Sequence, residues 1–269
     1  MKYLISPIKI LLIAIFLMAA NLTTAAQAAQ SAFSVPRELN LDRTVHRLFP
    51  GEYGRKAQQR MYTEGFFPIG WSRDGKFAYY VEPVDEECGC YYAELTIQDM
   101  RTDKVLWKFK YDQQDLMDEA GKMPPEDNIA KLWLKNKKLF SDKLQEHHIE
   151  QMVRIPLLGP TFSNARRSYT AALALARGND DDGQPRIKTL TLSLAAPAMG
   201  RKVLYKADYK DEMFGSPLDA GVAGAIKSPF ESRVAIVMME VERGWEGPPN
   251  TCDIRIVGAD LVTGFGKGK

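Results

Sequence analysis

Three cysteines are the residues whose chemistry the sequence defines most narrowly. Cys88 and Cys90 flank a single glycine, and Cys252 lies far along the chain. The close pair lacks the second pair of ligands that a zinc knuckle needs. In an oxidising compartment, three cysteines form either one disulfide and one thiol or three thiols. We expect Cys252 to pair with Cys88 or Cys90, because a long closed loop gives the larger stabilisation. A redox-active Cys88–Cys90 pair is the alternative.

Histidines and a carboxylate form the most metal-like cluster. His147, His148 and Glu150 are spaced so that imidazole and carboxylate groups about one helical turn apart could share an ion. With His46, the cluster would supply the three histidines of a catalytic zinc site in a metal-assisted hydrolase. However, both neighbouring histidines follow Leu144 by about one helical turn, which favours ordinary packing beside an apolar stripe. We therefore predict no bound metal and no other cofactor.

The other chemical patterns are weaker. The segment 179–183 (NDDDG) offers oxygen ligands suited to calcium, but it lacks the alternate spacing and the distal glutamate of a calcium loop. A solvated hairpin loop is therefore favoured. The sequence has no Gly-x-Ser-x-Gly nucleophile elbow and no phosphate-binding glycine loop followed by a helix. No catalytic signature is present, which favours a binding role.

Lysines on one predicted helix form a candidate interaction surface. Together with a tryptophan, they could lie on anionic lipid headgroups or engage an acidic partner. The alternative is a solvated face whose lysines keep the helix soluble. This lysine surface consists of Lys131, Trp133, Lys135, Lys137 and Lys138, with Lys143 following on the same helix.

The elements that must position these residues are mostly strands. Alternation of apolar and polar residues predicts antiparallel hairpins at 66–81 and 91–111, with Asp74-Gly75 supplying the positive φ of the first turn. Between the strands, apolar residues at three- and four-residue steps predict one long inserted helix at 126–153. Further strands are expected at 167–176, 187–194, 203–206, 222–226, 233–242 and 252–258.

The start of the sequence has the three parts of an export signal. Two lysines precede an apolar run at 10–20, and the small residues Ala26-Gln27-Ala28 follow. We predict cleavage after residue 28, so that residues 1–28 are a signal peptide and the protein is periplasmic or secreted. No later apolar segment has the length of a membrane span, so we do not expect an integral membrane protein.

The composition and length of the chain limit the class of partner and the number of domains. Cleavage removes two of the 36 basic residues and leaves 34, which equals the number of acidic residues. This balance argues against nucleic acid as a partner, because nucleic-acid binders carry a clear basic excess. We predict an N-terminal extension at 29–64, a single mainly β domain at 65–261 and a frayed tail at 262–269.

Three segments carry a resemblance to known families. The segment 69–79 (IGWSRDGKFAY) is similar to the hairpin opening of Tol-type propeller repeats, and 228–235 (SPFESRVA) reads as a degenerate second copy. With 244–248 (GWEGP), they resemble a family of predicted secreted bacterial proteins whose domain has no assigned function. The resemblance implies export and brings no catalytic residues. At most three repeats of blade length fit the chain, which favours an incomplete propeller-like or sandwich assembly of hairpin units.

These observations together predict a mainly β exported protein that is a non-enzymatic binding or interaction module of the cell envelope. Its partner would be an envelope protein or an anionic surface, contacted through loops on the sheet scaffold. The metal-assisted hydrolase that uses His46, His147 and His148 is the alternative.

Overall fold

The computed structural model describes residues 33–52, 61–179, 183, 185–209, 216–245 and 247–266. The chain divides into two units, Met1–Ser34 and Val35–Lys269, and every element below belongs to the second unit. The predicted signal peptide lies outside the described residues. Within them, no helix is both long enough and apolar enough to cross a membrane.

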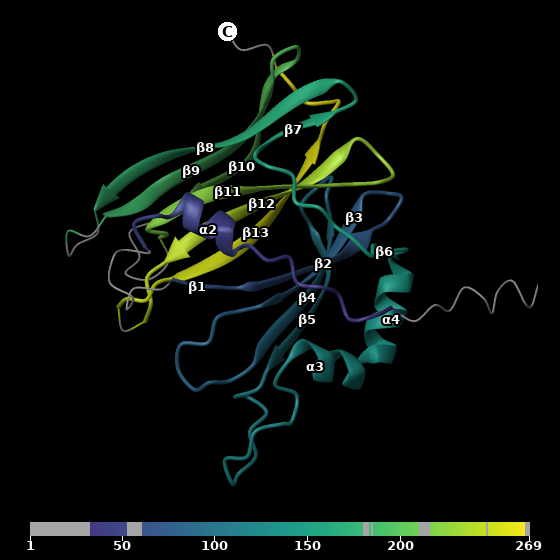
Figure 1. The fold of residues 1–269 in the computed structure, drawn as a ribbon, viewed down its shortest axis with the longest axis vertical. Coiled ribbons are helices and arrows are strands. Elements are labelled where there is room, and N and C mark those ends of the chain that lie inside the picture. The colour runs from purple at the N-terminus through teal and green to yellow at the C-terminus, as the bar shows by residue number, and fades with distance from the viewer. Residues whose placement is uncertain are drawn as a thin grey trace, which may run out of the picture. The chain divides into compact units, whose positions relative to one another are not determined.

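The protein is mainly β, as predicted, and its first sheet is an antiparallel meander with one added strand (Figure 1). The strands, in spatial order, are β5 (Val105–Asp112), β4 (Tyr92–Asp99), β3 (Lys76–Glu82), β2 (Gly65–Trp71) and β6 (Glu150–Gln151). The predicted Asp74-Gly75 turn joins β2 to β3, and Gly75 has a φ of 88°. A Cβ at this position would collide with the Glu231 carboxylate, so the turn requires glycine.

Two short helices pack against this sheet where the sequence predicted one long helix at 126–153. They are α3 (Ile129–Lys135) and α4 (Lys137–Glu146), with Asn136 between them. After α4, His148 adopts a left-handed φ of 57°, and residues 150–151 pair with β2. The prediction of a single helix is therefore wrong, because the apolar steps continue through two changes of backbone direction.

The sheet presents an apolar face to these helices. Tyr80, Leu95 and Phe109 lie opposite one another on β3, β4 and β5. The Phe109 ring contacts Phe140 of α4 with ring centroids 5.0 Å apart, and Phe140 contacts Trp133 of α3 at 5.1 Å. Because side chains alternate along a strand, residues of opposite parity point to the other face of the sheet.

The second sheet separates two hydrophobic cores. Its strands, in spatial order, are β1 (Tyr62–Thr63), β13 (Thr251–Asp260), β12 (Arg233–Glu242) and β11 (Asp219–Lys227). Along β12, Ile236 and Met238 enter one core, whereas Val237 and Met239 enter the other. A strand buried on both faces has a continuous apolar sequence, as residues 234–239 do.

The third sheet covers one face of the second. Its strands are β10 (Gly200–Asp208), β9 (Pro185–Ala196), β8 (Arg167–Asn179) and β7 (Thr161–Asn164). Leu190, Leu192 and Leu194 of β9 pack in the core that contains Ile236. Ser168 and Thr170, of opposite parity on β8, are exposed. This sheet therefore has one core face and one solvent face.

Segments that were predicted to lie outside the domain pack within it. Leu41, Val45 and Phe49, in and beside α2 (Asp42–Leu48), are buried in the core between the first and second sheets. Strand β1 pairs in parallel with β13. Near the other end, Gly266 forms a bridge with Arg201 of β10. The predicted extension and tail thus both contribute contacts to the β structure.

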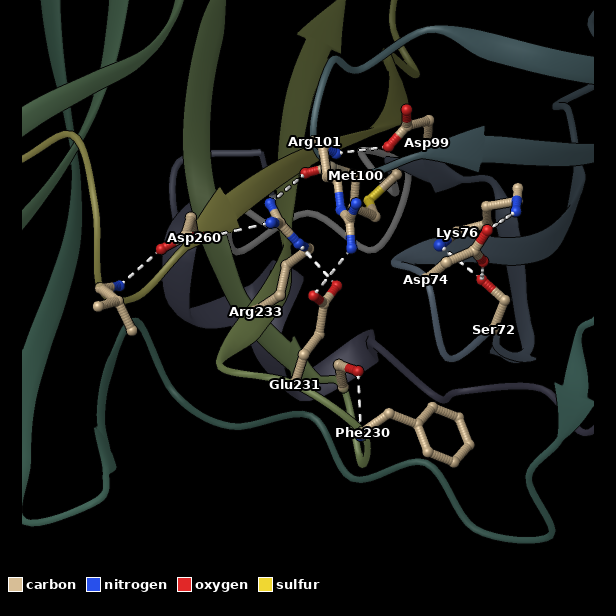
Figure 2. A network of polar contacts seen from close by, with 12 residues as sticks. Ser72, Asp74, Lys76, Asp99, Met100, Arg101, Phe230, Glu231, Arg233 and Asp260 are labelled. Atoms are coloured by element: carbon tan, nitrogen blue, oxygen red, sulfur yellow. Dashed lines mark hydrogen bonds and ion pairs between the residues drawn. The ribbon is translucent and has the colours of Figure 1, made fainter.

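Turns of the first and second sheets meet around Arg233 (Figure 2). The buried Arg233 guanidinium donates to Glu231 Oε1 at 2.9 Å, Met100 O at 2.9 Å and Asp260 Oδ2 at 3.1 Å. Arg101 adds a second ion pair to Glu231. A buried charge is tolerated only when its hydrogen bonds are satisfied, so this network fixes how the two sheets meet.

The two turns that were predicted as copies of one repeat share a hydrogen bond. In the β2–β3 turn, Ser72 N donates to Lys76 O, and in the β11–β12 turn, Ser228 N donates to Arg233 O, each at 2.9 Å. In both turns, the hydroxyl of the first serine also accepts a bond from a nearby backbone N–H. The sequence similarity therefore corresponds to similar turn chemistry.

Candidate functional site

The histidines and the carboxylate that were the candidate metal ligands do not come together. Within the described residues, no three or more histidine, cysteine, aspartate or glutamate side chains are grouped as metal ligands would be. Glu150 instead pairs with Arg73 Nε at 2.8 Å. His147 ends α4, and its burial lowers its pKa. His148 follows it in the left-handed turn, whereas His46 lies on α2, which packs against β11.

The disulfide differs from the prediction. Cys88 is bonded to Cys90, and Cys252 is a free, buried thiol. The predicted bridge to Cys252 is therefore wrong, because the alternation of β13 points that side chain into the core between the first and second sheets. Burial also raises the pKa of Cys252, and such a thiol is chemically inert.

The predicted lysine surface is largely neutralised. Four lysines pair with nearby carboxylates: Lys131 with Asp127 (2.6 Å), Lys135 with Glu126 (2.8 Å), Lys138 with Asp142 (2.6 Å) and Lys143 with Glu146 (2.7 Å). Lys137 has no ion pair within the described residues. Trp133 is only 2% exposed, so it belongs to the core and not to the surface. Residues 126–146 contain five lysines and four acids, which leaves a net charge of +1.

The acidic segment 179–183 falls mainly outside the described residues, which include only Asn179 and Gly183 of it. Asn179 ends β8 and pairs with Pro185 of β9. The segment thus connects two antiparallel strands, as the predicted hairpin requires.

A different set of residues forms the candidate site, which we call the loop end: residues 50–52, 62–64, 83–91, 243–245 and 247–250. Asn250 joins its segments. The Asn250 backbone carbonyl accepts a hydrogen bond from Tyr62 N at 2.9 Å, and its side-chain oxygen accepts one from Gly244 N at 3.4 Å. Its side-chain nitrogen donates to Glu52 Oε2 at 2.8 Å. Asn250 therefore ties its own loop together and joins it to the segments around Glu52 and Tyr62, which lie far earlier in the sequence.

The loop after β3 is ordered by one carboxylate and the disulfide. Asp85 accepts backbone hydrogen bonds from Glu87 at 3.2 Å, Cys88 at 3.3 Å and Cys90 at 2.9 Å. The next residue, Glu86, accepts a hydrogen bond from Trp245 N at 3.1 Å through its Oε1 atom. The disulfide-closed loop therefore supports the backbone of the tryptophan loop.

Two large aromatic side chains are exposed at the loop end. Trp245 is 65% exposed and Tyr62 is 50% exposed. Such side chains supply large contact areas at low conformational cost, and they dominate binding energy when a partner buries them. The GWEGP segment carried the family resemblance, but its tryptophan was not among the predicted site residues. The available signal was an aromatic residue flanked by glycines and prolines, in a loop that cannot bury it.

The ends of β12 and β13 beside the loop end carry an excess of carboxylates. Partial burial and the charges of Asp253 and Glu240 raise the pKa of Glu242 to about 7. Glu240 itself is compensated, because Tyr209 Oη donates to it at 2.5 Å and Arg255 Nη2 pairs with it at 2.9 Å. Glu242 has no ion pair within the described part of the chain. A cationic group that approached it would relieve this repulsion.

No known protein family, curated protein or solved structure matches this chain. Its function therefore has to be argued from the chemistry of the loop end itself. That chemistry is an exposed indole and phenol, held by an ordered backbone and surrounded by carboxylates. Among the described residues of the loop end, these groups are not arranged as a nucleophile with an adjacent base.

Proposed function

We propose that this protein is an exported, non-enzymatic interaction module of the cell envelope, and that it binds a basic protein segment at its loop end. The observation that carries the proposal is Trp245, which is 65% exposed on a loop held from two sides. Glu86 holds the Trp245 backbone, and Asn250 holds the adjacent Gly244. An exposed aromatic residue on an ordered loop loses little entropy on binding, so it suits a partner's pocket or side chain.

Charge favours a basic partner. Burial and the charge of Asp253 raise the pKa of Glu242, and burial together with the charges of Glu240 and Glu86 raises the pKa of Asp253. Carboxylates at the rim of a binding surface attract lysine and arginine side chains and accelerate their encounter. The face of Trp245 adds cation–π attraction for the same groups.

Two observations support export. The first is the leader-like pattern of residues 1–28 in the sequence. The second is the Cys88–Cys90 disulfide, since disulfides persist in oxidising compartments such as the periplasm and are rare in the cytosol.

The proposal extends to the architecture that supports the loops. We propose that the three sheets form an incomplete propeller-like assembly. Each sheet contains an antiparallel meander, with β2–β5, β7–β10 and β11–β13 in successive order, and β1 adds a fourth strand to the last. The shared hydrogen bonds of the β2–β3 and β11–β12 turns also support repetition.

Binding of fluorescent peptides to the purified protein tests the function. Two ten-residue peptides are compared by anisotropy, one with alternating lysine and one with alternating glutamate. We expect the lysine peptide to bind and the glutamate peptide not to bind. Trp245→Ala should weaken binding at least tenfold, since truncated hot-spot residues cost about 2 kcal/mol or more. Leu134→Ala is the matched control, because Leu134 is 74% exposed on α3, outside the loop end.

The role of charge needs its own control. Glu242→Gln should weaken lysine-peptide binding, whereas Glu119→Gln makes the same change in net charge outside the loop end and should have little effect. Equal binding of both peptides, or equal binding by the Trp245 variant and the parent, would contradict the proposal.

A further inference from the structure

Positive charge is concentrated on the third sheet. The sequence has no aspartate or glutamate at 151–179 or at 183–207, although these stretches contain nine lysines and arginines. The β7–β8 turn carries Arg166 and Arg167, and the start of β10 carries Arg201. All three arginines are exposed, and none forms an ion pair with any residue of the described ranges.

The three arginines lie on neighbouring turns. Arg167 Nη1 contacts Met199 Sδ at 3.4 Å, which brings the β7–β8 turn beside the β9–β10 turn. Arg201 forms a backbone bridge with Gly266, so the chain after β13 lies there too. We call these turns and residues 262–266 the arginine tip. Lys202 is not available on it, because its amine donates to Thr263 O at 2.9 Å and to Asp260 O.

The β7–β8 turn places an arginine where the backbone favours a different residue. Ala165 and Arg166 both have positive φ, at 46° and 66°. A two-residue hairpin turn with two positive φ values favours Asn-Gly, because other side chains collide with the backbone there. Strain of this kind is often found where a side chain is needed for recognition.

Apolar side chains accompany the arginines. Val203 of β10 is 51% exposed, and Val262, beside the Lys202 contact, is 54% exposed. A soluble polyanion would leave these valines in water, whereas the boundary between lipid headgroups and acyl chains would accommodate them. Arginine binds phosphate through two parallel hydrogen bonds, which phospholipid headgroups can accept.

We propose that the arginine tip docks the protein on a membrane surface rich in anionic phospholipid. This site is separate from the loop end. β13 runs from Thr251 beside the loop end to Asp260 beside the arginine tip, so the two surfaces lie about 30 Å apart at roughly 3.3 Å for each residue. The anionic surface expected from the sequence is thus assigned to arginines of the third sheet and not to the neutralised lysines of α3 and α4.

Sedimentation with vesicles tests this assignment in the purified exported protein. The vesicles are phosphatidylcholine alone, or phosphatidylcholine with about 30 mole percent phosphatidylglycerol, an anionic lipid that gives the vesicle a negative surface potential. We expect binding to the anionic vesicles only. Each arginine near such a surface contributes about a fivefold increase in affinity, so replacing Arg166, Arg167 and Arg201 by glutamine should weaken binding roughly 100-fold.

Matched variants keep the test decisive. Replacing Lys131, Lys135 and Lys138 by glutamine removes the same charge from the lysine surface and should change binding less than about threefold. Replacing the three arginines by lysine keeps the charge and should retain most of the binding to anionic vesicles. Circular dichroism checks that each variant is folded.

Three results would overturn the proposal. The first is equal binding by the arginine-to-glutamine variant and the parent, and the second is an equal loss in the lysine variant. The third is binding to soluble polyphosphate without binding to the anionic vesicles, which would assign the tip to a soluble polyanion. None of these results depends on peptide binding at the loop end, so the two proposals fail separately.

Discussion

Replacing Glu64 by glutamine tests how much the negative charge of this side chain, at the loop end, lowers the stability of the folded protein. Glu64 Oε2 accepts a hydrogen bond from Ile254 N at 2.7 Å, and the oxygen of a glutamine amide can accept the same bond. The substitution therefore removes a charge and keeps the shape and the contact. Burial and the charge of Asp253 raise the pKa of Glu64 from 4.5 to about 8.

Whether stability rises or falls with pH depends on which state, folded or unfolded, binds the Glu64 proton more tightly. Because the folded protein does so, the contribution of Glu64 to stability is complete below pH 4.5 and is lost as pH rises through about 8. A tenfold change in proton affinity is worth about 1.4 kcal/mol, so the complete loss is at most about 5 kcal/mol. The side chain is only partly buried, and screening by solvent reduces the expected loss to about 2 kcal/mol.

Urea unfolding followed by circular dichroism at pH 5 and pH 8.5 measures this loss. The E64Q variant should match the parent closely at pH 5 and exceed its free energy of unfolding by about 2 kcal/mol at pH 8.5. Glu242, whose pKa is about 7, should leave a smaller slope of the same sign in the variant. Glu119→Gln, in the exposed loop after β5, controls for net charge. A parent equally stable at both pH values, or a variant less stable at pH 8.5, would refute the reasoning.

Three further stability changes are expected. Ala165→Asn combined with Arg166→Gly should raise the free energy of unfolding by about 1–2 kcal/mol, because asparagine and glycine adopt positive φ at lower cost than alanine and arginine do. An unchanged melting temperature would contradict the inference that this turn is strained. Arg233→Met should cost about 2–3 kcal/mol in urea unfolding, because it removes the hydrogen bonds of a buried guanidinium to Glu231, Asp260 and Met100 O, and a loss below 1 kcal/mol would show that the network is dispensable. Reduction of Cys88–Cys90 should cost no more than about 1.5 kcal/mol, since the closed loop has only three residues. Counting free thiols confirms the reduction, and a thermal melt of the reduced protein measures the loss of stability. A reduced protein that is unfolded would contradict this limit.

Local pattern predicted the hairpins because their determinants are local. Asp74-Gly75 adopts the expected turn, and the alternation in 66–81 and 91–111 specifies four strands of the first sheet. The apolar run at 233–242 also forms a strand, β12, and its two faces serve two different cores. A continuous apolar run is typical of a strand buried on both faces, but the identity of the covering sheets depends on tertiary contacts that no local pattern contains.

The errors have physical causes of the same kind. Apolar steps at 126–153 reflect packing against the first sheet, and they persist across Asn136, where two helices meet. The cysteine prediction rested on an oxidising compartment and on loop-closure entropy, whereas the side-chain parity of β13 directs Cys252 into a core. The lysine surface was counted without the carboxylates one helical turn away, such as Asp127 beside Lys131. In each case, the outcome depended on residues that are neighbours in the folded structure and that the local sequence pattern does not identify.

The position of the two surfaces on one strand pair determines how they should work together. The loop end and the arginine tip lie at opposite ends of β12 and β13, about 30 Å apart by strand rise. Charges interact over about 8 Å at physiological salt, so neither surface should alter the affinity of the other through electrostatics. Of the strands between them, β12 is buried on both faces, which leaves it little freedom for a conformational change that would couple the two surfaces. A protein of this construction would hold a basic partner at a fixed distance from an anionic membrane without switching.

The affinity of the protein for the lysine peptide should accordingly be the same, within about twofold, with and without saturating anionic vesicles. Peptide that binds directly to the lipid is subtracted in this comparison. A larger change would show coupling through the sheets and would replace a passive tether with an allosteric one.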